Sequence, residues 1–203
     1  MCEKLIAYLI ILILSIGGIW LSQYLTSLED TRYHLSKKEK IFNYIAVLIS
    51  NLLVALNLNM NLGPILLLRC MMVALLFTSF IIDIKVMELP DTLTFVSLIP
   101  AICLFYYNIR LIDFGLSAAV IVLSCIIMIA LFILGGLGFG DVKLIIPILL
   151  TVPGTYALSY WIIVLAAAVA ESIFFYLFMK AKKISFGPCL IISMIWIYIM
   201  NIF

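Results

Sequence analysis

The sequence predicts an all-α polytopic membrane protein, a bundle of about seven to eight transmembrane helices. Of its 203 residues, 67% are hydrophobic and 11% are charged, and the mean hydropathy is +1.34. Soluble domains are roughly half apolar and a quarter charged. Long apolar runs also recur along the whole chain, separated by short segments that contain charges, glycine or proline. This composition excludes an ordinary water-soluble domain.

The first apolar run covers residues 5–24, which is long enough to cross about 30 Å of hydrocarbon at 1.5 Å per residue. No small-x-small cleavage pattern follows it, so we interpret it as a retained span rather than a signal peptide. The stretch from Glu29 to Lys40 then holds seven of the 22 charged residues. Residues 1–41 are therefore predicted to be one N-terminal transmembrane helix and a short loop.

Further spans are predicted wherever an apolar run lies between helix breakers, such as Leu89-Pro90-Asp91 and the glycines at 135–140. The segment between Val142 and Pro153 is short for a span, and tilted, re-entrant or kinked arrangements all fit its length. The predicted spans are 42–58, 64–83, 92–108, 114–135, 143–152, 155–179 and 187–203.

The positive charges predict the orientation, because Lys and Arg in short loops mark the cytoplasmic side of a membrane. With the N-terminus outside, nine of them lie inside: Arg32, Lys37, Lys38, Lys40, Lys85, Lys143, Lys180, Lys182 and Lys183. Only Lys4 and Arg110 then lie outside, with Arg69 within a span. Two spans separate Asp83 from Asp141, so both carboxylates are predicted at the cytoplasmic edge.

Other functional classes receive little support. A net charge of +2, carried by short clusters, does not indicate nucleic-acid binding. The single histidine, His34, is predicted to be solvated. Five cysteines lack any C-x-x-C spacing and are interpreted as small apolar residues rather than zinc ligands or disulfides: Cys2, Cys70, Cys103, Cys125 and Cys189. No metal site is predicted.

The candidate functional residues are Asp83 and Asp141, because acids at the edge of hydrocarbon are costly. Asp141 lies in Gly138-Phe139-Gly140-Asp141, and glycines without a Cβ permit close backbone approach. Two neighbouring carboxylates that share one proton can act as general acid and general base in peptide hydrolysis. The same pair of acids can also bind a cation.

Several ionisable residues have structural interpretations. Asp91 is predicted to be an N-cap, and Asp141 can serve as one. Lys85 and Lys143 are predicted to be interfacial anchors. Glu171 lies well inside a span, where acids face a bundle interior or a water-filled cavity. It keeps open an alternative function, a small proton- or cation-coupled transporter that uses intramembrane carboxylates.

The motifs D-x-x-x-x-x-L-P-D at 83–91 and G-x-G-D-V-K-L at 138–144 resemble those of the type IV prepilin peptidase family, membrane aspartyl proteases of the GxGD type. Ser185-Phe186-Gly187-Pro188 is similar to the F-G-P that opens the last helix of bacterial members. The resemblance covers residues 42–203, which it identifies as a membrane-embedded peptidase domain. It implies that Asp83 and Asp141 are the catalytic residues, with Gly138, Gly140 and Pro90 as structural parts of the motifs.

The resemblance further implies removal of a short basic leader from prepilins or pseudopilins at the cytoplasmic face of the bacterial inner membrane, in pilus, secretion or competence systems. Many bacterial members carry a zinc-binding cytoplasmic domain between the first two spans and also N-methylate the mature pilin. Here a cysteine-free loop of about 18 residues takes that place. We therefore predict no cofactor, neither zinc nor S-adenosylmethionine. Glu29, Asp30, Glu88 and Asp91 lie on the correct face to attract a leader, and the sequence does not choose among them.

Overall fold

The computed structural model describes residues 2–57, 63–109, 114–135, 137–152, 156–174 and 186–200. Arg110, Lys180, Lys182, Lys183, Ser185 and Pro153-Gly154, which the sequence-based predictions use, lie outside these residues. The described residues form eight α-helices and one 3-10 helix, η1, without strands, which confirms the predicted all-α class. Within the described ranges, three helices are long and apolar enough to cross a membrane, and four shorter apolar helices accompany them.

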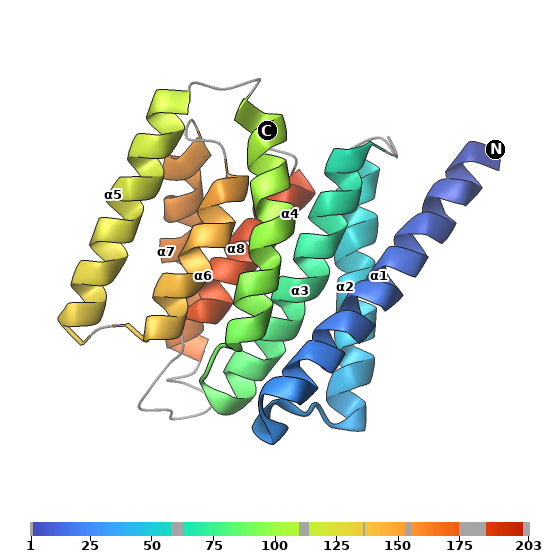
Figure 1. The fold of residues 1–203 in the computed structure, drawn as a ribbon, viewed down its shortest axis with the longest axis horizontal. Coiled ribbons are helices and arrows are strands. Elements are labelled where there is room, and N and C mark those ends of the chain that lie inside the picture. Colours follow the sequence, from blue (N-terminus) through green and yellow to red (C-terminus); the bar gives the residue numbers. More distant parts are fainter. Residues whose placement is uncertain are drawn as a thin grey trace.

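Successive helices run in alternating directions through one bundle (Figure 1). Their bounds are α1 Cys2–Glu29, η1 Thr31–Tyr33, α2 Lys37–Asn57, α3 Pro64–Val86, α4 Asp91–Ile109, α5 Phe114–Ile133, α6 Phe139–Thr151, α7 Ala157–Phe174 and α8 Gly187–Met200. The ends of α1 and α3 and the starts of α2, α4, α6 and α8 share the lower end of the bundle in Figure 1. This arrangement gathers the motif-bearing helix ends.

The charged stretch after the first span is more helical than predicted. The structure extends α1 to Glu29 and begins α2 at Lys37, so the linker is shorter than a loop ending at Lys40. Glu29, Lys37 and Lys38 are exposed, so helix propensity rather than burial decides the structure at these positions. As a result Glu29 is held on a helix end, at the lower end of the bundle in Figure 1.

The first helix is packed into the bundle rather than attached loosely to it. A Cβ added to Gly18 would lie 2.8 Å from the Cβ of Ala74, so α1 approaches α3 at backbone distance. Asn51 Nδ2 on α2 donates to Ser15 Oγ of α1 at 2.9 Å. Ser22 of α1 and Thr78 of α3 share a hydrogen bond of 2.8 Å. Small residues and interhelical hydrogen bonds are the usual means of joining helices in lipid.

Helix α3 occupies the centre of the bundle. It contacts α1, α2, α4 and α8, and most of its length is buried. Helix α6 begins four residues before the predicted span at 143 and has 13 residues, so at 1.5 Å per residue it is about 20 Å long. It packs against α4, α5 and α8. The two helices that carry the candidate acids are therefore enclosed by other helices.

Candidate active site

Asp83 lies one turn before the end of α3 and is 2% exposed. The Met87 N–H closes this turn by donating to the Asp83 carbonyl oxygen at 2.7 Å. Met87 itself adopts the left-handed conformation with φ +57°, which few non-glycine residues adopt. The chain consequently reverses over the end of α3, and the Pro90 carbonyl then accepts the Thr94 N–H at 3.2 Å to start α4.

Asp141 lies in the first turn of α6 and is 6% exposed. The Gly138 N–H donates to Asp141 Oδ2 at 3.2 Å, and the Gly187 N–H is a second backbone donor to this carboxyl group. Gly138 has an ordinary φ of −78°, and a Cβ on it would meet only ordinary contacts. Gly138 thus acts through its N–H, and the predicted close approach at this glycine is wrong.

The two acids meet beside Gly187, the first residue of α8. A Cβ placed on Gly187 would collide with Asp83 Oδ2 and would lie 3.3 Å from Asp141 Oδ1. Both carboxylates therefore face one point at the start of α8. Sequence reasoning noted the F-G-P segment but assigned Gly187 no site role; a glycine directly before Pro188 at a helix start was the available signal.

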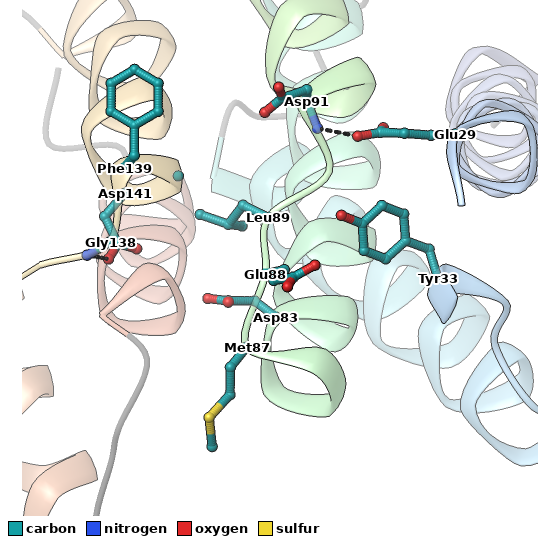
Figure 2. A pocket seen from close by; sticks show the side chains of 11 residues that line it. Glu29, Tyr33, Asp83, Met87, Glu88, Leu89, Asp91, Gly138, Phe139 and Asp141 are labelled. Carbon is teal, nitrogen blue, oxygen red and sulfur yellow. Dashed lines mark hydrogen bonds between the residues drawn. The ribbon is translucent and has the colours of Figure 1, made fainter. Parts of the chain in front are cut away.

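An open cavity of about 340 Å³ lies over the pair (Figure 2). Asp83 and Asp141 project toward each other from opposite sides of it, with Leu89 between their helices (Figure 2). Its lining is strongly acidic and comprises Glu29, Tyr33, Asp83, Met87, Glu88, Leu89, Asp91, Gly138, Phe139, Gly140 and Asp141. Two buried acids in an accessible, acidic cavity can activate water and attract a cationic ligand.

Gly140 provides the close approach that the sequence predicts. A Cβ on Gly140 would lie 3.1 Å from the Leu89 Cβ, so the first turn of α6 packs directly on the loop that follows Asp83. We expect Gly140→Leu to lower the turnover rate at least about 100-fold, because a shift of about 1 Å between catalytic groups can cost that much.

Membrane insertion and detergent extraction measure whether the Gly140→Leu protein still folds. Gly140→Ala should be intermediate, since its single methyl group meets only a tight contact. Gly63→Leu is the matched control, because a Cβ at Gly63 meets nothing within 4 Å. Wild-type turnover in Gly140→Leu would contradict the close-approach argument.

The structure gives three charged residues partners that the sequence does not indicate, and it shows that the N-cap interpretation of Asp91 is wrong. Asp91 is not the N-cap of α4, because its carboxylate binds Lys143 Nζ at 2.8 and 2.9 Å. The first two N–H groups of α4, those of Asp91 and Thr92, instead donate to Glu29 of α1. Lys143 is likewise more than a lipid anchor, and its ammonium group also lies 4.6 Å from the centre of the Phe139 ring. Lys85 binds Glu39 Oε2 at 3.1 Å and the His34 carbonyl at 2.7 Å.

The remaining acids have separate partners. Asp30 and Glu88 both pair with Arg32, at 2.7 and 3.1 Å. The Arg32 hydrogen bonds lower the pKa of the Asp30 carboxyl. The side chain of His34 is exposed, as predicted. Glu171 is half-buried on α7, outside the described cavity lining, and accepts a hydrogen bond of 2.5 Å from Cys189 Sγ.

Comparison with known proteins identifies one family. The model of the type IV leader peptidase family matches residues 70–179, more than half of the chain. The matched segment includes Asp83 and Asp141 but neither Glu29 nor Gly187. No curated protein and no solved structure matches the chain.

Proposed function

Because the chain belongs to the type IV leader peptidase family, we propose that it is a membrane aspartyl endopeptidase that removes the short basic leader of prepilins or pseudopilins. The observation that carries the aspartyl assignment is the convergence of Asp83 and Asp141 on one point beside Gly187, under an open cavity. Nothing in the described residues supports the transporter alternative, since Glu171 is bound to Cys189 and does not line this cavity.

The backbone suggests how the two acids divide the work. In this proposal Asp141 is the ionised member of the pair, because a carboxylate there accepts the Gly138 N–H and lies at the positive end of α6. Asp83 lies at the negative end of α3 and holds the shared proton. The two carboxyl groups titrate as a pair, so this division describes one protonation state of the pair.

Hydrolysis then follows in two steps. Asp141 takes a proton from water as the water oxygen attacks the peptide carbonyl carbon, and Asp83 gives its proton to the carbonyl oxygen. The resulting tetrahedral diol collapses as the C–N bond breaks. Asp141 returns its proton to the leaving amine, and Asp83 recovers a proton from a diol hydroxyl group, which restores the starting state.

The location of the cavity fits a substrate with two different halves. In the orientation predicted from the loop charges, the cavity opens at the cytoplasmic face of the bacterial inner membrane. A basic leader would remain there near anionic headgroups. The apolar helix of the pilin would lie in the bilayer beside the bundle, and the scissile bond, after a glycine, would rest level with both aspartates.

Co-expression with prepilin-type substrates tests the function, with leader removal followed by gel shift. Wild-type protein and Glu171→Gln should both remove the leader, because Glu171 plays no chemical part. Absence of cleavage by folded wild-type protein with several substrates, together with ion flux through reconstituted protein that depends on Glu171, would overturn the proposal in favour of transport.

The mature substrate is expected to carry an unmethylated N-terminus, since this chain has no counterpart of the cysteine-containing domain that accompanies methylation in many relatives. Mass spectrometry of the cleaved pilin measures this directly. Chelator treatment should leave the cleavage rate unchanged. A product one methyl group heavier, or stoichiometric zinc in the purified protein, would contradict the prediction.

A further inference from the structure

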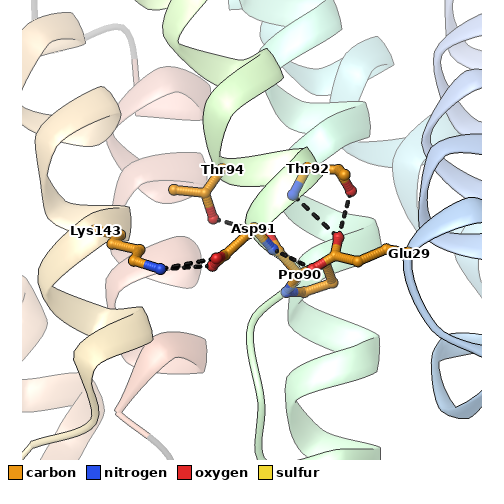
Figure 3. Close-up of polar contacts among 6 residues, drawn as sticks. All are labelled: Glu29, Pro90, Asp91, Thr92, Thr94 and Lys143. Carbon is orange, nitrogen blue, oxygen red and sulfur yellow. Dashed lines mark hydrogen bonds and ion pairs between the residues drawn. The ribbon is translucent and has the colours of Figure 1, made fainter.

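A chain of polar contacts joins α1, α4 and α6 at the rim of the cavity (Figure 3). Glu29, the last residue of α1, accepts hydrogen bonds from the Asp91 N–H at 2.9 Å and the Thr92 N–H at 3.0 Å. It also accepts a hydrogen bond from the Thr92 hydroxyl group at 2.6 Å. The Asp91 carboxylate in turn binds Lys143 Nζ through both oxygens, at 2.9 and 2.8 Å. The end of α1, the start of α4 and the second turn of α6 are thus linked in series.

This series of polar contacts involves residues that lie close in sequence to both candidate catalytic acids. Asp91 begins α4 directly after the loop that follows Asp83, and Lys143 lies two residues after Asp141. The Asp91–Lys143 pair therefore spans the two segments whose separation sets the distance between the carboxylates. Gly140 and Leu89 also touch across this gap. Apolar contact of that kind is non-directional, whereas charge-assisted hydrogen bonds impose a direction.

Resting on the function proposed above, we propose that Glu29, Asp91 and Lys143 are positioning residues that hold Asp83 and Asp141 in catalytic register. Glu29 fixes the start of α4 from outside, as an N-cap supplied by another helix. Lys143 then fixes α6 to that start. Glu29 lies outside the segment that matches the family model. Its hydrogen bonds to the start of α4 make α1 part of the catalytic unit in this proposal.

A purely structural role predicts a different pattern of effects. The side chains of Lys143 and Asp91 are 28% and 50% exposed, and ion pairs at such sites contribute little to stability. Loss of the pair should therefore leave thermal unfolding in detergent nearly unchanged. If the pair sets the register of the acids, the same loss should lower kcat with little change in KM, because substrate binding is not what it controls.

Charge reversal tests the pair. Asp91→Lys and Lys143→Asp should each lower kcat at least about tenfold, since small displacements of reacting groups are costly. The double variant restores an ion pair of opposite sense and should recover most of the lost kcat. Glu29→Ala should also lower kcat, and Glu29→Gln, which keeps one acceptor oxygen, should lie between Glu29→Ala and wild type.

The Lys85–Glu39 ion pair provides a matched control. Lys85 follows Asp83 by two residues, as Lys143 follows Asp141, but it binds α2 rather than the segments that face each other across the cavity. Lys85→Glu and Glu39→Lys should leave kcat unchanged.

A second readout does not depend on cleavage. Spin labels on Met87→Cys and Phe139→Cys, both exposed, report the separation of the two segments in a background with Cys2→Ser, Cys103→Ser and Cys125→Ser. The distance distribution should broaden in Asp91→Lys and narrow again in the double variant.

The two readouts separate failure of the inference from failure of the function. Active single reversals with unchanged distance distributions would overturn the positioning role, and so would a raised KM with unchanged kcat, which would make Asp91 a substrate contact. If the distance distributions respond as expected in a protein that removes no leader, the positioning geometry stands and the proposed function is wrong.

Discussion

Asp83→Asn and Asp141→Asn are each expected to lower the rate of leader removal at least about 1,000-fold. Asparagine keeps the size and shape of the side chain but neither accepts the proton of the attacking water nor donates one to the carbonyl oxygen. General acid and general base steps contribute about 100- to 10,000-fold each. The double variant should be scarcely slower than either single variant, because the two groups act as one unit.

The measurement is single-turnover cleavage of a purified prepilin-type substrate in detergent, with folding monitored by thermal unfolding. Both acids are buried and face each other, so replacement of either one by neutral asparagine should not lower the unfolding temperature. Asp30→Asn is the matched control, because Asp30 pairs with Arg32 outside the described cavity lining. Wild-type cleavage by either active-site variant would remove that aspartate from the catalytic pair.

Gly187→Ala is expected to lower the cleavage rate at least about 100-fold while the protein still inserts and folds. Its methyl group would collide with Asp83 Oδ2, with Asp141 Oδ1 at 3.3 Å and Leu89 Cδ1 at 3.2 Å. The Asp83 carboxylate must move away to make room for the methyl group, so the distance between the two carboxylates increases. A displacement of catalytic groups of this kind lowers the reaction rate strongly.

Cleavage kinetics compared with Gly17→Ala, where a Cβ meets nothing within 4 Å, would isolate the local effect at Gly187. The loss should appear in kcat rather than KM. A Gly187→Ala enzyme with wild-type kcat would show that the start of α8 does not constrain the acids.

The global features of the fold follow from composition and from the order of apolar runs. Burial of apolar residues in a membrane is a bulk property, and every span that fell on described residues overlaps a helix of the structure. The location of Asp83 and Asp141 at the same face could also be predicted from the sequence, because two intervening spans return the chain to that face. Gly140 was identified for its lack of a Cβ, and its contact with Leu89 supplies the reason.

The hydrogen-bonding partners of individual side chains could not be predicted from the sequence. Local sequence favours Asp91 as an N-cap, yet its carboxylate binds Lys143, 52 positions along the chain. The cap of α4 comes from Glu29, 62 positions before Asp91. Gly187 was passed over as a site residue because its neighbours in sequence carry no acid. Each of these contacts depends on a separation of a few ångströms between segments that only helix packing brings together.

The membrane class, the number of helices and the common face of the two acids therefore lie in the amino-acid sequence, because hydrophobicity and span parity act over whole segments. The register of the acids depends on the packed bundle. Gly187 admits both carboxylates to one point, and Glu29 and Lys143 tie their segments together across three helices, through hydrogen bonds whose short range no sequence spacing reveals.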